Sequence, residues 1–272
     1  MVSHSGLVTV MQRAVRKAAP RLRRDFGEVE QLQVSRKGPG DFVSMADKRS
    51  EQTLVDELKQ ARPDWGLLLE ERGVVEGDPD KPRWIVDPLD GTTNFLHGIP
   101  HFAISIAVED PRGAQGKPEI THGLVYQPLT DETFWAEKGR GSWLHDRRLR
   151  VSARRYLDEA VIGTGIPHLG RSDAARWSSI YARIAPEVAG VRRLGAASLD
   201  FAWLAAGRYD GFWEDDLDVW DAAAGILLVR EAGGFVSDFR GQDRMAERRE
   251  YLAANGELHS KLHKLVGGAL RG

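Results

Sequence analysis

The stretch that most constrains the fold runs from Trp84 to Pro100. It begins with three consecutive apolar residues, 84–86, which are favoured in β-strands and predict a buried strand. A proline disfavours the helical conformation in the residue before it, so Pro88 keeps Asp87 extended. We therefore expect a buried strand that presents the Asp87 carboxylate at its carboxyl end.

A second carboxylate and a tight turn follow within a few residues. Asp90 precedes Gly91, which permits a tight turn because it has no side chain. Thr92 or Thr93 can then cap a short helix that runs through Leu96. Hard cations prefer carboxylate and carbonyl oxygens, whereas phosphate prefers the amide groups at a helix N-terminus. This segment offers both.

Turn chemistry alone gives a simpler explanation, because Asp-Pro and Asp-Gly favour Asx-type turns without any ligand. The longer segment, from Asp87 to Pro100, is more specific than these two dipeptides. Asp-Pro-Leu-Asp-Gly-Thr-Thr-Asn-Phe-Leu-His-Gly-Ile-Pro resembles the metal-binding signature of the inositol monophosphatase family of magnesium-dependent phosphatases. A second segment, Trp220 to Gly225, is similar to the Trp-Asp-x-Ala-Ala-Gly signature of that family. The matching segments occur in family order over nearly the whole chain.

The resemblance implies a site for Mg²⁺ with oxygen ligands alone. Two such ions about 3.5–4 Å apart can hold the attacking and the leaving oxygen of a phosphoryl transfer. By analogy, Glu70, Asp87 and the Leu89 carbonyl hold the first ion, and Asp87, Asp90 and Asp221 hold the second. A third, weaker ion near Glu70 is also compatible with the resemblance. Asp221 has a simpler explanation too, because a carboxylate near a helix start complements the helix dipole.

Glu70 enters this set through its position after another apolar run. The run from Trp65 to Leu69 predicts a strand. Adjacent strand residues point to opposite faces, so at most one of Glu70 and Glu71 faces the site. The family places its glutamate ligand first in such a pair, which implies Glu70. Leu69 stands where the family usually has a small residue.

Thr92, Asp47 and Glu70 are the catalytic residues that the resemblance implies. The Thr92 hydroxyl would help to deprotonate a metal-bound water, and Asp47 would orient that hydroxyl. Taken alone, Asp47 is explained as a carboxylate in the first turn of a helix, where it suits the dipole. The amides of Gly91 and Thr92 would hold the phosphate.

The implied substrate-binding residues come from both halves of the chain. Glu214 stands seven residues before Asp221, where the family has a substrate-binding glutamate. Gly195, Ala196 and Ala197 resemble a small-residue turn that approaches the substrate in the family. The complete implied set is Gly91, Thr92, Gly195, Ala196, Ala197, Glu214 and Asp221.

Composition excludes several other kinds of site. The 272 residues include no cysteine, which excludes disulfides, thiolate zinc sites and cysteine nucleophiles. The net charge of −2 favours neither nucleic acid nor a membrane as partner. No segment approaches the roughly 18 apolar residues of a membrane span, and the N-terminus lacks a signal-peptide pattern. We therefore expect a cytoplasmic protein.

Two local patterns have alternative explanations. Residues 7–26 predict a helix that Pro20 should kink or interrupt, with six cationic residues on its outer face. Such a face can bind nucleic acid, but it is more often simply solvated. His97 and His101 have the spacing of zinc ligands on a helix, but Gly98 and Pro100 argue against a helix there, so we reject a zinc site.

Apolar periodicity predicts a helix, a hairpin, consecutive antiparallel strands and then alternating strands and helices. This order fits α/β class and the layered αβαβα sandwich that the resemblance implies. We expect a single domain, residues 1–272, and a homodimer, since the family is commonly dimeric.

Three functions remain open at this point. The first is magnesium-dependent hydrolysis of inositol monophosphate. The second keeps the chemistry but changes the substrate to histidinol phosphate, fructose bisphosphate or 3′-phosphoadenosine phosphate. Glu214 and the chain length favour the inositol-type branch over the bisphosphatases. The third is a regulatory protein that binds RNA or the transcription machinery through the basic N-terminal helix.

Overall fold

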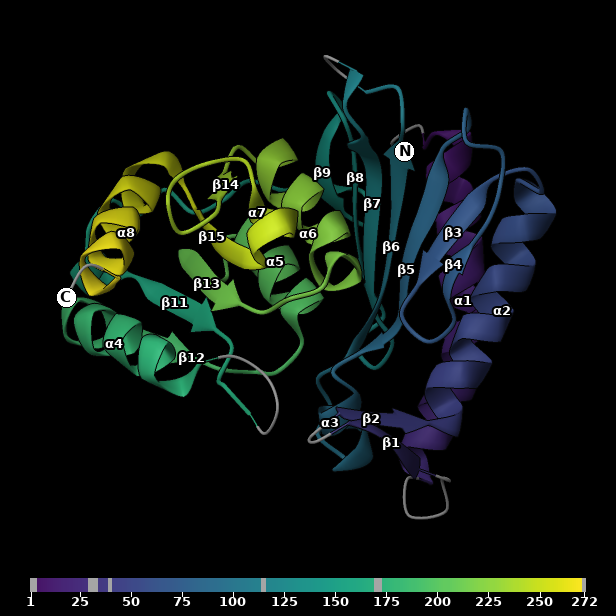
Figure 1. Ribbon diagram of the computed structural model, residues 1–272, viewed down its shortest axis with the longest axis horizontal. Helices are drawn as coiled ribbons and strands as arrows, with labels where there is room; N and C mark the ends of the chain where they lie inside the picture. Colours follow the sequence, from purple (N-terminus) through teal and green to yellow (C-terminus); the bar gives the residue numbers. More distant parts are fainter. Residues whose placement is uncertain (1–3, 29–33, 39–40, 114–115, 169–172, 271–272) are drawn as a thin grey trace.

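The structure, a computed structural model, describes residues 4–28, 34–38, 41–113, 116–168 and 173–270. Helices and strands of these ranges alternate in five layers, which follow one another across Figure 1. Two helices cover the outer face of an eight-stranded sheet. Two more lie between this sheet and a five-stranded one, and a last pair covers the far face of the second sheet. The expected layered αβαβα sandwich is confirmed.

The first sheet carries the apolar 84–86 run on a central strand. Strand β5 (Arg83–Asp90) pairs in parallel with β3 (Gly66–Leu69) and antiparallel with β6 (Ala103–Asp110). The sheet continues through β4 (Gly73–Val75) on one side and, on the other, through β7 (Glu119–Gln127), β8 (Glu132–Glu137), β9 (Gly141–Leu144) and β10 (Arg147–Arg148). Residues 84–86 are buried, as their apolar run predicts.

The carboxyl end of β5 is irregular. The register between β5 and β6 shifts between Asp87 and Asp90, so the strand continues past its expected end at Asp87. Such an irregularity redirects side chains at the edge of a sheet. Helix α3 (Thr92–Leu96) follows, and its N-cap is Gly91 with φ of 90°. The expected threonine cap is wrong, because the Thr92 hydroxyl bonds to other groups described below.

Helices α1 (Gly6–Gly27) and α2 (Met45–Ala61) pack together over the outer face of the first sheet. The α1 helix buries Val8, Met11, Val15 and Leu22, at helical spacing. It runs through Pro20 without a break, so of the expected kink or interruption, the interruption is wrong. A proline inside a helix costs about 3 kcal/mol. The apolar face of α1 is buried on both sides of Pro20, and this packing outweighs that cost.

The second sheet has the order β12-β11-β13-β15-β14. Its strands are β11 (Val161–Thr164), β12 (Gly190–Arg192), β13 (Gly211–Asp215), β14 (Phe235–Ser237) and β15 (Glu250–Ala254). Helices α5 (Ala197–Ala205) and α6 (Val219–Glu231) separate the two sheets, and α4 (Ala174–Ile184) and α8 (Gly256–Ala269) cover the outer face. Gly123 lets α6 approach β7 closely, because a Cβ there would lie 2.8 Å from the Ala224 carbonyl oxygen.

The remaining elements are short. Strands β1 (Val34–Gly38) and β2 (Asp41–Ser44) form a separate hairpin, and α7 (Met245–Arg248) precedes β15. The alternating pattern of residues 29–34 predicts a strand, but residues 29–33 lie outside the described ranges. The expected cap of α4 is Ser172 or Asp173. Asp173 fills it through the Ala175 and Arg176 amides, and Ser172 lies outside the described residues. None of the described helices is long and apolar enough to cross a membrane.

Candidate active site

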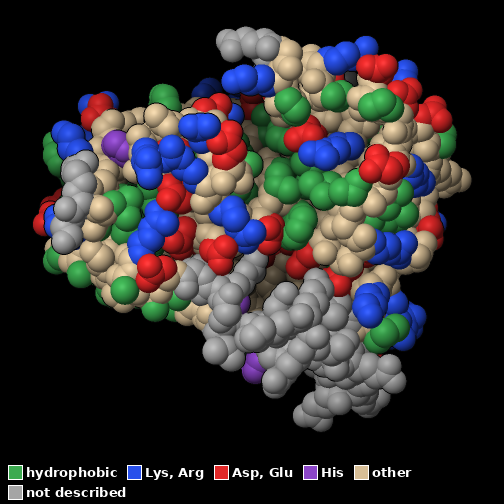
Figure 2. All heavy atoms as spheres, viewed as in Figure 1, with side chains coloured by type: hydrophobic (Ala, Val, Ile, Leu, Met, Phe, Trp, Pro, Cys, Tyr) green, Lys and Arg blue, Asp and Glu red, His purple; other side chains and the backbone are tan. Residues whose placement is uncertain are grey.

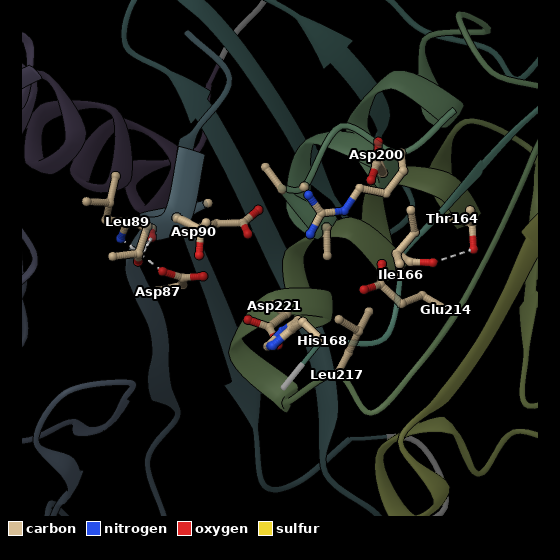
Figure 3. A pocket seen from close by; sticks show the side chains of 18 of the residues that line it. Asp87, Leu89, Asp90, Thr164, Ile166, His168, Asp200, Glu214, Leu217 and Asp221 are labelled. Carbon is tan, nitrogen blue, oxygen red and sulfur yellow. Dashed lines mark hydrogen bonds between the residues drawn. The ribbon is translucent and has the colours of Figure 1, made fainter. Parts of the chain in front are cut away.

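A pocket of about 340 Å³ lies where the irregular end of β5 meets the middle helix layer and β13. Figure 3 shows Asp87, Leu89 and Asp90 together at one end and Thr164, Ile166 and Glu214 together at the other. The predicted residues that line it are Glu70, Asp87, Leu89, Asp90, Gly91, Thr92, Gly195, Ala196, Ala197, Glu214 and Asp221. Segments about 130 residues apart in the sequence thus meet in one pocket.

Asp87 is held by a local turn. Its Oδ1 accepts a hydrogen bond from the Leu89 amide at 2.9 Å, which is the Asx-type turn that Asp-Pro favours. The side chain is 1% exposed. Burial and the negative charges of Glu70, Asp90 and Asp221 raise the pKa of Asp87 well above its usual range. A cation in the pocket would relieve this repulsion.

The Thr92 hydroxyl lies between two acceptors. Its oxygen is 3.0 Å from Asp47 Oδ1 and 3.0 Å from the Leu89 carbonyl oxygen. Asp47 is fully buried in the first turn of α2 and does not itself line the pocket. The single hydroxyl hydrogen can be donated to either acceptor. The oxygen lone pairs then stay available to a water molecule on the pocket side.

Asp90 is bound by the start of α5. Its Oδ2 accepts hydrogen bonds from the Ser198 amide at 2.8 Å and from the Ser198 hydroxyl at 2.5 Å. Burial raises the pKa of Asp90 to about 6, and the Ser198 donors partly oppose this rise. The negative charge of Asp90 also suits the N-terminal end of a helix.

Glu70 follows the last residue of β3, and its amide donates to the Val86 carbonyl of β5. The neighbouring loop is fixed by Glu51 of α2, which is fully buried. Glu51 accepts a hydrogen bond from the Glu71 amide at 2.9 Å and pairs with Arg72 at 3.0 Å. Two separate contacts therefore hold the backbone around Glu70 beside β5.

Asp221 has a structural role and a position in the pocket. It is the third residue of α6, and its Oδ2 accepts a hydrogen bond from the Asp218 amide in a capping box. The simpler explanation of Asp221, a carboxylate that suits the start of a helix, therefore corresponds to a hydrogen bond in the structure. Because the side chain also lines the pocket, the cap fixes its orientation there.

Glu214, at the other end of the pocket, packs against Gly165. A Cβ on Gly165 would lie 1.9 Å from Glu214 Oε1, so the glutamate occupies the space that any side chain at position 165 needs. Burial and the charges of Asp200 and Asp221 raise the pKa of Glu214 well above its usual range. Asp200, which is 1% exposed, also lines the pocket.

The small-residue turn at Gly195 lines the pocket, and Asn94 holds it in place from behind. The Asn94 side-chain amide donates to the carbonyl oxygens of His101 at 2.8 Å and Leu194 at 2.7 Å. Gly195 has φ of 85°, and a Cβ there would lie 2.9 Å from the Arg193 guanidinium. Asn94 therefore joins the segment after α3 to the turn before α5, and the glycine lets them approach.

The donor set suits a hard cation. Glu70, Asp87, Asp90 and Asp221 are carboxylates, and the pKa of Asp87 is raised first by burial and then by repulsion from the other three. Within the ranges that the structure describes, no three acidic or histidine side chains already stand in a metal-binding arrangement. Carboxylates that repel one another across a pocket need a cation between them to converge. The chemistry of these donors fits Mg²⁺, and all four line the same pocket.

Comparison with known proteins agrees with this geometry. The sequence profile of the inositol monophosphatase family matches residues 4–271. The chain belongs to the inositol monophosphatase family. An inositol-1-monophosphatase of Mesorhizobium japonicum is 52% identical over 265 residues, which cover 97% of each chain. A protein named Nus factor SuhB from Pseudomonas aeruginosa is 42% identical and covers 94% of each chain.

A solved structure of this family has the same fold. The extragenic suppressor protein suhB of Bartonella henselae superimposes with a TM-score of 0.92 at 50% identity, covering 96% of this chain and 98% of that one. The resemblance read from the signature strings is therefore confirmed. The class of enzyme expected from them agrees with the names of the inositol-1-monophosphatase relatives.

Several residues of the pocket were missed by sequence reasoning. They are Thr93, Thr164, Gly165, Ile166, His168, Arg193, Asp200 and Leu217, and behind them Asn94 and Ser198. Asp200 and Ser198 had a usable signal, since both are polar in the first two turns of an otherwise apolar helix. The rejected zinc site at His97 and His101 is not helical, since α3 ends at Leu96.

Proposed function

We propose that this member of the family hydrolyses a small phosphate monoester with the help of Mg²⁺, most simply inositol monophosphate to inositol and phosphate. The observation that carries the proposal is that Glu70, Asp87, Asp90 and Asp221 meet in one pocket beside Thr92. The names of relatives that are 50–52% identical support the same activity.

The chain's own groups prepare the reaction in three ways. Thr92 gives its hydrogen to Asp47 or to the Leu89 carbonyl, so its oxygen can accept a hydrogen bond from the attacking water. Gly91 and Thr92 open α3 and present backbone amides to the phosphate. Bound Mg²⁺ supplies charge neutralisation for the carboxylates and polarises the phosphate and the leaving oxygen.

Glu214 is proposed to bind the alcohol part of the substrate. It lies at the opposite end of the pocket from Asp87 and Asp90 (Figure 3). A carboxylic side chain can hydrogen-bond to inositol hydroxyls, and it has no evident part in the phosphate chemistry. Histidinol phosphate stays the alternative substrate, since a carboxylate also pairs with its amine.

A panel of phosphate monoesters tests the activity. Release of inorganic phosphate from inositol 1-phosphate, histidinol phosphate, fructose bisphosphate and 3′-phosphoadenosine phosphate is measured with Mg²⁺ and again with a chelator. We expect turnover of inositol 1-phosphate that the chelator abolishes.

Asp90→Asn is expected to be nearly inactive at saturating Mg²⁺ with unchanged circular dichroism. Full turnover in chelator, or a wild-type rate for Asp90→Asn, contradicts the proposal.

A role in nucleic-acid binding has less support. Of the cationic face of α1, Arg13 and Lys17 pair with Glu57, and Arg21 pairs with Asp25. Acidic and basic side chains are interspersed over the face of the molecule in Figure 2. The relatives named Nus factor SuhB keep this question open, and a salt-dependent gel shift with RNA tests it.

A further inference from the structure

The contact between Ser198 and Asp90 links the two halves of the pocket. Asp90 ends β5 of the first sheet, and Ser198 is the second residue of α5 in the middle layer. Asp90 is 8% exposed and Ser198 is fully buried. Both hydrogen bonds from Ser198 end on the same oxygen, Oδ2, at 2.8 Å from the amide and 2.5 Å from the hydroxyl.

Because both Ser198 donors bond to Oδ2, they determine which oxygen of Asp90 is left for a ligand. With Oδ2 occupied by Ser198, Oδ1 is the oxygen of Asp90 that is available to a cation. The hydroxyl bond acts with the backbone amides at the start of α5 to oppose rotation of the carboxylate, since rotation would break charge-assisted hydrogen bonds in a buried place. Partners of this kind orient metal ligands, and their loss typically lowers metal affinity or activity about 10- to 100-fold.

The hydrogen bond from the Ser198 amide to Asp90 has an additional structural explanation. The first amides of a helix lack partners within the helix, and the N-cap residue of α5, Ala196, makes no side-chain cap. The Asp90 carboxylate therefore caps α5 from another element. This explanation accounts for the Ser198 amide but not for its hydroxyl, because an alanine at position 198 would keep the amide bond.

We propose that Ser198 is a positioning residue whose hydroxyl orients Asp90 for binding a divalent cation. The inference rests on the proposed function, since it takes Asp90 as a ligand. It predicts that removing the hydroxyl weakens cation binding even where the fold is kept.

The test is titration of Mg²⁺ into chelator-stripped protein by calorimetry. Ser198→Ala is compared with Ser198→Cys, which keeps nearly the same size and a weaker donor. The matched control is Ser237→Ala, which also loses a buried hydroxyl, one that bonds to the Asp238 carbonyl at 2.8 Å in the second sheet. Thermal unfolding of each variant in chelator measures the fold separately.

We expect Ser198→Ala to weaken Mg²⁺ binding at least about 10-fold, Ser198→Cys to lie in between, and Ser237→Ala to bind as the wild type does. If Ser198→Ala is less stable in chelator but binds Mg²⁺ with wild-type affinity, the hydroxyl serves the fold alone and the inference is overturned. If Ser198→Ala does not fold, wild-type affinity in Ser198→Cys has the same meaning. A wild type that binds no Mg²⁺ contradicts the proposed function itself.

Discussion

At the scale of single residues, the Thr92 hydroxyl has two acceptors for one hydrogen. Thr92→Ala is expected to lower kcat about 10²- to 10⁴-fold, the usual range for a group that assists proton transfer. Mg²⁺ affinity should change much less, because the hydroxyl is not a proposed ligand. Asp47→Asn should act in the same direction, since Asp47 receives the hydroxyl hydrogen.

The double variant shows whether the two residues act together. When two residues serve one proton path, the double variant loses less activity than the product of the losses in the two single variants. Single-turnover rates at saturating Mg²⁺ for both single variants and the double variant measure this. Strictly multiplicative losses would show that Asp47 and Thr92 act independently, and the orienting role of Asp47 would be wrong.

His101 makes the stability of the protein depend on pH. Burial lowers the pKa of His101 from 6.5 to about 4. Between pH 6.5 and pH 4 the unfolded chain therefore binds a proton that the native state does not. The contribution of the neutral, buried His101 to the free energy of unfolding is present above this window and is lost as the pH falls through it. At about 1.36 kcal/mol per pH unit, it amounts to about 3 kcal/mol.

Replacing His101 by phenylalanine should remove this contribution and keep the ring contact with Trp203. Urea unfolding in chelator at pH 7 and pH 4 measures it, with the exposed His97→Gln as control. The fall in free energy of unfolding should be about 3 kcal/mol smaller in His101→Phe than in the control. Equal falls would show that His101 is protonated in the native state.

At the scale of elements, β11 and β13 together place Glu214. Glu214→Gln should lower kcat/KM for inositol 1-phosphate about 10- to 150-fold, the loss of a charge-assisted hydrogen bond worth about 1.5–3 kcal/mol. The rate with p-nitrophenyl phosphate, which has no such hydroxyls, should change little. Gly165→Ala should have the same selective effect, because its Cβ displaces the Glu214 carboxylate. Equal losses with both substrates would instead assign Glu214 to the fold or to the metal site.

Helix α2 shows how one element can organise several loops. Asp47, Ser50 and Glu51 lie on one face at helical spacing. They bond to the Thr92 hydroxyl, to the Pro88 carbonyl at 2.8 Å and to the Glu71 amide. One rigid helix thus aligns two segments of the candidate site, the end of β5 with the start of α3 and the loop after β3. Sequence reasoning assigned only Asp47, because the resemblance to the family points to that residue, whereas nothing near Ser50 or Glu51 in the sequence indicates their partners.

The elements of the fold were predictable where the pattern is local. The run 84–86 and the Asp-Pro turn follow from residues next to one another, and both are confirmed. The continuity of α1 through Pro20 and the cap of α3 were not predictable, because packing and a tertiary hydrogen bond decide them. Ser198 stands out as a polar residue in an otherwise apolar helix, but its partner Asp90 is 108 residues away and no local pattern identifies it.

At the scale of the whole molecule, the expected single domain and homodimer stay predictions. The dimer rests on the resemblance to the family. Light scattering after size-exclusion chromatography should give twice the mass of one chain at micromolar concentration. The mass of one chain, unchanged on a tenfold increase in concentration, would contradict it.

The position of the pocket between two sheets has a consequence for the synthesis of the chain. Asp47, Glu70 and Asp90 come from the first hundred residues, whereas Ser198 and Asp221 come from the last third. During translation the first sheet can form early, but it has no complete pocket until α5 and α6 pack against it. A nascent or truncated chain that lacks α5 and α6 is therefore expected to be inactive. On refolding, activity should return only with this late, long-range docking step, after the tryptophans of the first sheet are already buried.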